Sequence, residues 1–104
     1  MKQPLQIRFV GVDPSEAVET AARAKAEKLD LFRSDIMSCR VTIELVARRQ
    51  QQGRPFAVRI EVTVPDRVLM VDRVQDEDVY VALRDAFDDM TRQLEDSVRR
   101  VRGR

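Results

Sequence analysis

Apolar and polar residues alternate along several segments of the chain, which predicts strands that have one buried and one solvated face. The clearest segments are residues 5–12, 39–45 and 56–64, and a shorter, less regular strand is expected over residues 68–74. Residues 47–55, between the second and third segments, are polar and basic and contain Gly53 and Pro55. We therefore expect them to form a hairpin tip that projects into solvent.

Two other segments repeat their apolar residues at steps of three and four, as in helices. The first starts at Asp13-Pro14-Ser15-Glu16, where we expect Asp13 to be the N-cap, and continues to about Phe32. The second begins near Asp76. The expected buried stripes are Val18, Ala22, Leu29 and Phe32 in the first helix, and Tyr80, Leu83, Phe87, Met90, Leu94, Val98 and Val101 in the second.

Lys25 lies within the apolar stripe of the first helix. Its aliphatic stem can pack on the sheet while its ammonium group reaches the edge of the helix. Alternatively, the ammonium group can be held in place to bind an anion, and both interpretations can be true together.

The predicted order of elements is β-α-β-β-β-α. This order indicates an α+β fold with one four-stranded sheet and two helices packed on one of its faces, similar in topology to a double-stranded RNA-binding domain. Residues 1–104 are expected to form a single domain, with a basic, frayed tail from about residue 99.

The composition argues against catalysis and against cofactors. The 104 residues include no His, one Cys and three Gly, so the commonest general base is missing and no glycine-rich phosphate loop can be written. We expect no metal site either. The acids Asp76, Glu77 and Asp78 lie at the start of a helix, where the helix dipole favours negative side chains. The acids further along should form ion pairs with arginines four residues later, namely Asp88 with Arg92, Glu95 with Arg99 and Asp96 with Arg100.

No apolar stretch has the length of a signal peptide or a membrane span, so a cytoplasmic protein is expected. Cys39, the single cysteine, is expected to fill the core and is consistent with a reducing compartment.

The formal net charge is only +1, so electrostatic arguments depend on where the charges lie. Residues 1–47 contain seven Lys or Arg, and residues 48–104 contain twelve. The expected sheet face away from the helices has no aromatic side chain that could stack on a base, which favours contacts to phosphates and RNA shape. The candidate RNA-binding residues are Arg23, Lys25 and Lys28 on the first helix, Arg92, Arg99 and Arg100 on the second, and Arg48, Arg49 and Arg54 in the hairpin tip.

The second helix contains Asp78-Val-Tyr80-Val-Ala82-Leu83, followed by Arg92-Gln93-Leu94. This segment resembles the helix D-x-Y-x-A-[IL]-x-x-x-[IL]-[DN]-K-L-x-R-Q-L of the ribosome hibernation promoting factor and ribosome-associated inhibitor A family. The first helix is similar to the family's E-A-[LI] and A-K-x-x-K-L elements at residues 16–18 and 24–29. The resemblance covers nearly the whole chain and includes the order of its elements.

The resemblance implies a stress or stationary-phase factor that occupies the tRNA and mRNA channel of the small ribosomal subunit, contacts ribosomal RNA through its helices and inhibits translation. Lys25, Lys28 and Arg92 stand at matching basic positions. The similarity is to the family's short form, without the carboxy-terminal dimerisation domain of the long form. Three residues depart from the pattern, because Asp89 replaces a usual Lys, and Glu95 and Asp96 stand where basic residues are usual.

Two alternatives come from the same residues. The α-β-β-β-α part of the predicted order is also that of a double-stranded RNA-binding module. The other alternative is a homodimeric protein-protein interaction domain, which pairs through a sheet edge or through the polar sheet face.

Overall fold

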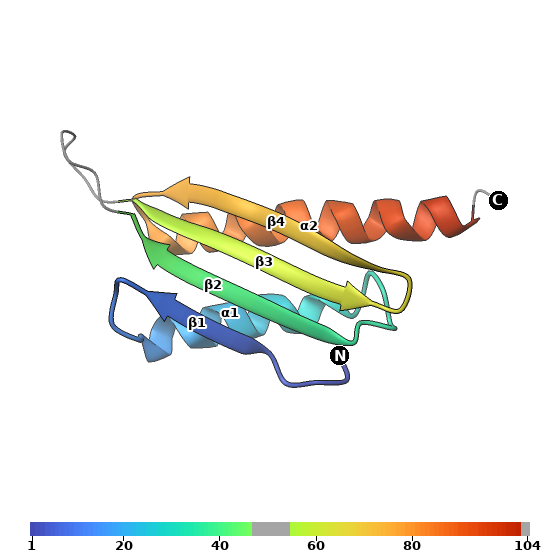
Figure 1. Cartoon of the computed structure of the whole chain (residues 1–104), viewed down its shortest axis with the longest axis horizontal. Coiled ribbons are helices and arrows are strands. Elements are labelled where there is room, and N and C mark those ends of the chain that lie inside the picture. Colours follow the sequence, from blue (N-terminus) through green and yellow to red (C-terminus); the bar gives the residue numbers. More distant parts are fainter. Residues whose placement is uncertain (47–54, 103–104) are drawn as a thin grey trace.

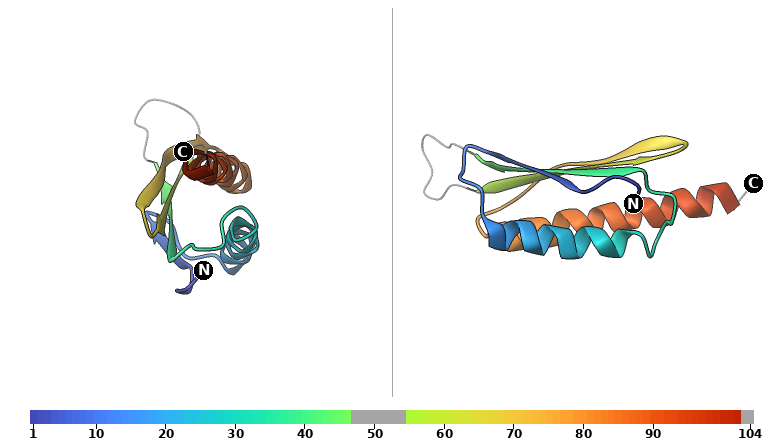
Figure 2. Two further views of the ribbon diagram at one scale, coloured as in Figure 1. Left: turned by 90° about the vertical axis from the view of Figure 1, so that its right-hand side faces the viewer. Right: turned by 90° about the horizontal axis from the view of Figure 1, so that it is seen from below.

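The computed structural model describes residues 1–46 and 55–102, with side chains described as far as Arg99. The order of its elements is β-α-β-β-β-α, as predicted, and the four strands form one sheet in the order β1-β2-β3-β4. Both helices cover the same face of this sheet and leave the other face open (Figures 1 and 2). The elements are β1 (Gln6–Val10), α1 (Glu16–Leu29), β2 (Ser38–Leu45), β3 (Phe56–Val64), β4 (Arg67–Asp76) and α2 (Val79–Arg102).

Strand pairing places alternate side chains in the core. β1 runs parallel to β2 and is connected to it through α1, whereas β2, β3 and β4 pair antiparallel. Val41 lies beside Ile60, and Ile60 lies beside Val71, so these three residues form one apolar rung under the helices. The predicted alternation is thereby confirmed for β2 and β3, whose inward residues are all buried except Phe56 and Leu45 at the strand ends.

The first helix starts and ends differently from the prediction. Its N-cap is Ser15, not Asp13, because the Ser15 hydroxyl accepts a hydrogen bond of 3.3 Å from the backbone N–H of Val18. The helix ends at Leu29, so Phe32 lies beyond it and is 39% exposed. Ala26 takes the fourth buried position of α1 in place of Phe32.

The second helix also begins later than predicted, since β4 continues to Asp76. Asp78 caps α2, with its carboxylate accepting from the N–H of Tyr80 at 2.9 Å. The predicted stripe is buried at Leu83, Phe87, Met90 and Leu94, but Tyr80 is 47% exposed. Val98 is half-buried, and the side chain of Val101 lies outside the described residues. The tail expected to fray from residue 99 is helical as far as Arg102.

The end of α2 extends beyond the sheet. In Figures 1 and 2 its last part projects past the turn between β3 and β4. Neither α1 nor α2, over the residues that the structure describes, is long and apolar enough to cross a membrane.

Candidate nucleic-acid interface

The two helices run side by side in the same direction, so their outer sides form one surface, which we name the inter-helix surface (Figures 1 and 2). Phe32, just after α1, and Val98 of α2 line the same hollow at one end of this surface. With about 100° of rotation per residue, Lys25 and Lys28 lie on the flank of α1 that leads to Phe32 and so faces α2. Arg23 lies on the opposite flank of α1.

The cations of α1 are not paired with any residue that the structure describes. Arg23 and Lys28 are exposed and Lys25 is half-buried. None of these three side chains makes an ion pair or hydrogen bond to another residue in the described part of the chain. Their charges are therefore available to an external anion, and the half-buried position of Lys25 agrees with a stem that packs while its ammonium group reaches solvent.

The cations of α2 whose side chains are described, Arg84, Arg92 and Arg99, are each beside a carboxylate. Arg92 pairs with Asp89 and Arg99 pairs with Asp96 at 3.9 Å, and both guanidinium groups point away from the core, with side-chain exposures of 69% and 78%. Arg84 likewise contacts Asp85, at 3.1 Å. The prediction that Arg92 pairs with Asp88 and Arg99 with Glu95 is wrong. Residues three apart on a helix are also neighbours, and each arginine contacts the aspartate three residues before it.

The outer side of α2 is consequently short of free positive charge. Over residues 79–99 it carries five acids and three arginines, and Asp88 and Glu95 make no ion pair with a described residue. Among the described cations that the sequence suggested, those of α1 make no ion pair with a described residue, whereas Arg92 and Arg99 of α2 do. α1 also carries three acids without such a partner, which by helical rotation lie on the flank of Arg23, namely Glu16, Glu19 and Glu27. The free positive charge of α1 is therefore concentrated at Lys25 and Lys28.

Arg33 connects three segments that are distant in the sequence. It follows α1, and its side chain is only 10% exposed. Its Nε donates to Asp35 Oδ1 at 2.5 Å, its Nη2 to Asp66 Oδ1 in the β3–β4 turn at 2.5 Å, and its Nη1 to Ser97 Oγ of α2 at 3.0 Å. The network fixes the loop after α1 against the point where α2 leaves the sheet.

The same contacts shift the acid strengths of the network. Hydrogen bonds from Arg33, together with its charge, lower the pKa of Asp35 and Asp66 below the ordinary value of 3.8, and Arg67 adds a further hydrogen bond to Asp66. The hydrogen bond to Asp35 raises the pKa of Arg33 in turn. All three groups therefore stay charged near neutral pH.

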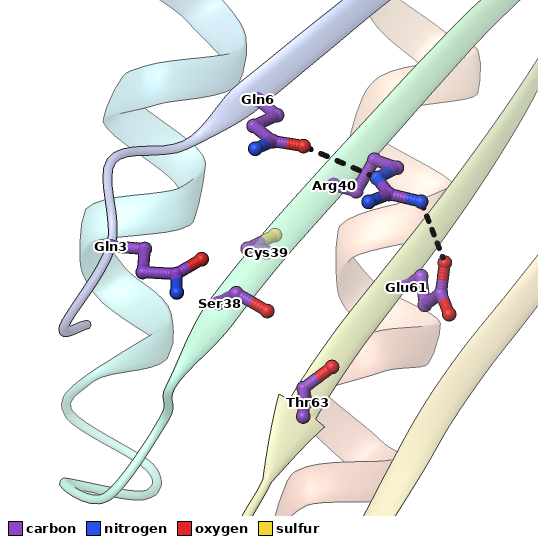
Figure 3. A pocket seen from close by; sticks show the side chains of 7 residues that line it. All are labelled: Gln3, Gln6, Ser38, Cys39, Arg40, Glu61 and Thr63. Atoms are coloured by element: carbon purple, nitrogen blue, oxygen red, sulfur yellow. Dashed lines mark hydrogen bonds and ion pairs between the residues drawn. The ribbon is translucent and has the colours of Figure 1, made fainter.

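The open sheet face is polar and largely paired within itself. Figure 3 shows Arg40 between Gln6, at 3.3 Å, and Glu61, at 3.8 Å, beside a small depression of about 70 Å³ that is also lined by Ser38 and Thr63. One rung further along, Arg59 binds Asp72 at 2.8 Å. Arg40 and Arg59 are thus already paired, whereas Arg8 and Arg73 on the same face make no ion pair with a described residue.

Groups suited to catalysis are not apparent among the described residues. Burial, with a smaller contribution from the charge of Asp30, raises the pKa of the Cys39 thiol to about 12, so it is neither ionised nor accessible as a nucleophile. No three His, Cys, Asp or Glu side chains in the described ranges are grouped closely enough to hold a metal ion.

Some residues lie outside this description, and others were missed. Arg48, Arg49 and Arg54, as well as the side chain of Arg100 and hence its expected pair with Asp96, fall outside the described residues. Sequence reasoning did not find Arg33 or the fully buried Ser97. A serine within the apolar spacing of α2 was the available signal for Ser97, whereas Arg33 gave none.

This arrangement defines a class of α+β proteins with four strands and two parallel helices on one sheet face. It is similar to the Protein Y N-terminal domain of Thermus thermophilus, with 20% identity, a TM-score of 0.73 and coverage of 89% of this chain and 97% of that one. It is also similar to a ribosomal subunit interface protein from Coxiella burnetii, with 17% identity, a TM-score of 0.75 and coverage of 89% and 94%. At these identities the similarity establishes the fold alone.

The family follows from the sequence match. The model described as "Sigma 54 modulation protein / S30EA ribosomal protein" matches residues 5–102, and the chain belongs to this family. The predicted kinship with ribosome hibernation factors is thereby confirmed at the level of the family, which is one of ribosome-associated proteins. No curated protein matches the sequence.

Proposed function

We propose that the protein is a non-catalytic, cytoplasmic stress factor that binds the small ribosomal subunit, occupies its tRNA and mRNA channel through contacts to ribosomal RNA, and so inhibits translation. The family supports the ribosome as the partner. The observation that carries the RNA contact is that Lys25 and Lys28, on the flank of α1 that faces α2, make no ion pair with a described residue. Arg23, on the other flank, is proposed as a further contact.

The α2 arginines supply further contacts in this proposal. Exposed ion pairs are worth only about 0–1 kcal/mol, so Arg92 and Arg99 can exchange their aspartates for phosphates at little cost. Arg48, Arg49, Arg54 and Arg100 are proposed as additional contacts. The binding surface is then centred on α1, with α2 in a secondary role.

Sedimentation of the protein with purified small subunits over a series of salt concentrations tests the proposal. Each phosphate contact releases counterions, so affinity should fall steeply as salt is raised. The double reversal Lys25→Glu with Lys28→Glu should abolish binding and leave the thermal unfolding midpoint nearly unchanged. Adding Arg92→Glu should contribute less than either lysine, because Arg92 starts from an ion pair.

The matched control is Arg8→Glu with Arg73→Glu. These two arginines are exposed, make no ion pair with a described residue and lie on the opposite side of the sheet from the helices. The charge change is the same, so the control should bind nearly as well as the parent protein. Equal losses from both pairs would show that net charge, and not the α1 surface, determines binding.

Other outcomes favour the alternative functions. Equal affinity for plain duplex RNA of about 16 base pairs would favour a double-stranded RNA-binding module. Association that is indifferent to salt and to ribonuclease would favour a protein-protein domain or a homodimer. In a cell-free translation assay, failure to inhibit despite ribosome binding would contradict the proposed occupation of the channel.

A further inference from the structure

A hollow of about 450 Å³ opens at the end of the inter-helix surface, where α1 ends and α2 begins to project beyond the sheet. We name it the terminal hollow. It is lined by residues 30–35 and by Val98. Two of its apolar side chains are turned to solvent, since Leu31 is 82% and Phe32 is 39% exposed.

The loop that carries these apolar side chains is held firmly in place. The N–H groups of Leu31 and Phe32 donate to the carbonyl oxygens of Lys28 and Leu29 at 3.1 and 3.0 Å. The Arg33 network then fixes the next residue against α2 and the β3–β4 turn. Phe32 is therefore presented to solvent by an ordered backbone, so little conformational entropy is lost when a ligand packs on it.

On the α1 side, the free charge beside the terminal hollow is positive, whereas on α2 Glu95 lies one turn before Val98 without a described partner. The carboxylates that line the hollow are already paired, Asp30 with the amino group of Met1 at 2.9 Å and Asp35 with Arg33. Lys28 lies one helical turn before Phe32 and Lys25 one turn earlier, and neither is paired within the described ranges. The combination is an exposed aromatic ring with free cations leading away from it along one flank of a helix.

We propose that the terminal hollow holds one unstacked base of the bound RNA, with the base lying against the Phe32 ring and its phosphate on Lys28. Stacking on aromatic side chains is a common way of holding splayed bases. A hydrogen-bonding group for the base edge is present in the hydroxyl of Ser34, which is exposed. This inference rests on the proposed function and adds a base contact to its phosphate contacts.

A protein partner fits this hollow less well. Its apolar surface comes from Leu31, Phe32 and Val98, whereas a stable protein interface engages about 20–30 residues on each side. A single flat ligand attached to a polyanion matches the size of the patch and the sign of the free charge on its α1 side.

The absence of tryptophan from the sequence allows a direct test. The variant Phe32→Trp gains a single indole, whose fluorescence should be quenched when purified small subunits are added. The control Val68→Trp places the indole on the open sheet face, at a residue that is itself exposed, and should show no such quenching. An unchanged emission of Phe32→Trp in a complex that has formed would overturn the proposal.

Binding measurements separate the ring from the charge. Phe32→Leu should weaken binding by about 5- to 150-fold without changing its salt slope, and Phe32→Tyr should retain the parent affinity. Lys28→Gln should instead reduce the salt slope by about one. Equal losses from Phe32→Leu and Leu31→Ser, without rescue by Phe32→Tyr, would overturn the base contact in favour of a protein contact.

The two proposals can fail separately. If the parent protein does not sediment with small subunits at any salt concentration, the proposed function fails and the base contact fails with it. If the parent binds with the expected salt dependence and Phe32→Leu binds equally well, the proposed function stands and only the base contact is refuted. Thermal unfolding of each variant checks that it is folded at the temperature of the assay.

Discussion

Arg33 shows how a single side chain can determine the relation between elements that are far apart in the sequence. It contacts the loop after α1, the β3–β4 turn and α2, and four of its hydrogen bonds lie within 3.1 Å. Replacing it with Ala leaves Ser97 and Asp35 without this donor, whereas Asp66 keeps its hydrogen bond from Arg67. We expect the free energy of unfolding to fall by about 1–3 kcal/mol, since the exposed carboxylates remain hydrated. Chemical denaturation of Arg33→Ala beside Arg59→Ala, whose Asp72 pair is exposed, measures the difference.

The same network predicts a dependence on pH. The pKa of Asp35 and of Asp66 is lower in the folded protein, so their contribution to stability is fully present above the ordinary value of 3.8 and is lost as the pH falls through the lowered values. Asp35→Asn with Asp66→Asn should be less stable than the parent near neutral pH. The difference should shrink below about pH 4, as measured by urea unfolding at a series of pH values. A difference in stability that stays constant with pH would contradict the role of these two carboxylates.

At the scale of the elements, the cap of α1 separates two neighbouring residues that look equivalent in the sequence. Ser15→Ala should cost about 1 kcal/mol of stability, because it removes the acceptor for the N–H of Val18. Asp13→Ala should change stability by less than about 0.5 kcal/mol, since Asp13 is exposed and does not cap the helix. The two variants, compared by thermal unfolding, form a matched pair. A larger loss for Asp13→Ala would show that the cap lies there.

The packing of α2 on the sheet gives a second comparison between like residues. Leu94 is fully buried under the sheet, and Leu94→Ala should destabilise the protein by about 2–5 kcal/mol through lost burial and the cavity that remains. Leu31→Ala removes the same atoms from an 82% exposed position and should change stability by less than about 0.5 kcal/mol. The midpoints of denaturant unfolding of the two variants measure this difference. Similar losses would mean that Leu31 is covered in solution.

The sequence was sufficient for the elements and their order because periodicity reports directly on burial. It was weaker at their ends, where short-range hydrogen bonds decide. Asp13 and Ser15 are both good caps, and Arg73, with φ of +57°, occupies a left-handed backbone position in β4 that no pattern indicated. For the site, sequence spacing put Arg92 and Arg99 on the outer side of α2, but the choice of Asp89 and Asp96 as their partners depends on side-chain conformation.

At the scale of the whole molecule, the distribution of free charge matters more for RNA binding than the net charge does. The net charge is +1, and α1 carries three acids and three cations. Lys25 and Lys28 nevertheless lie without a described partner on the flank of α1 that faces α2, while Asp88 and Glu95 on α2 repel the same polyanion. Asp88→Asn with Glu95→Gln should therefore tighten binding to small subunits, by less than about tenfold and mainly at low salt. Glu44→Gln with Glu61→Gln, on the open sheet face, makes the same charge change and should have little effect. Equal gains from both pairs would refute a preferred side.

The buried thiol of Cys39 has a practical consequence. It is the single cysteine of the sequence and lies on β2, an internal strand, beneath the helix layer. A thiol reagent can react with Cys39 only after the structure around it opens. The rate of labelling therefore measures how often the native protein opens at this place in the core. A bound ligand that bridges α1 and α2 would slow this rate, and the unmodified protein would thus report its own occupancy without any attached probe.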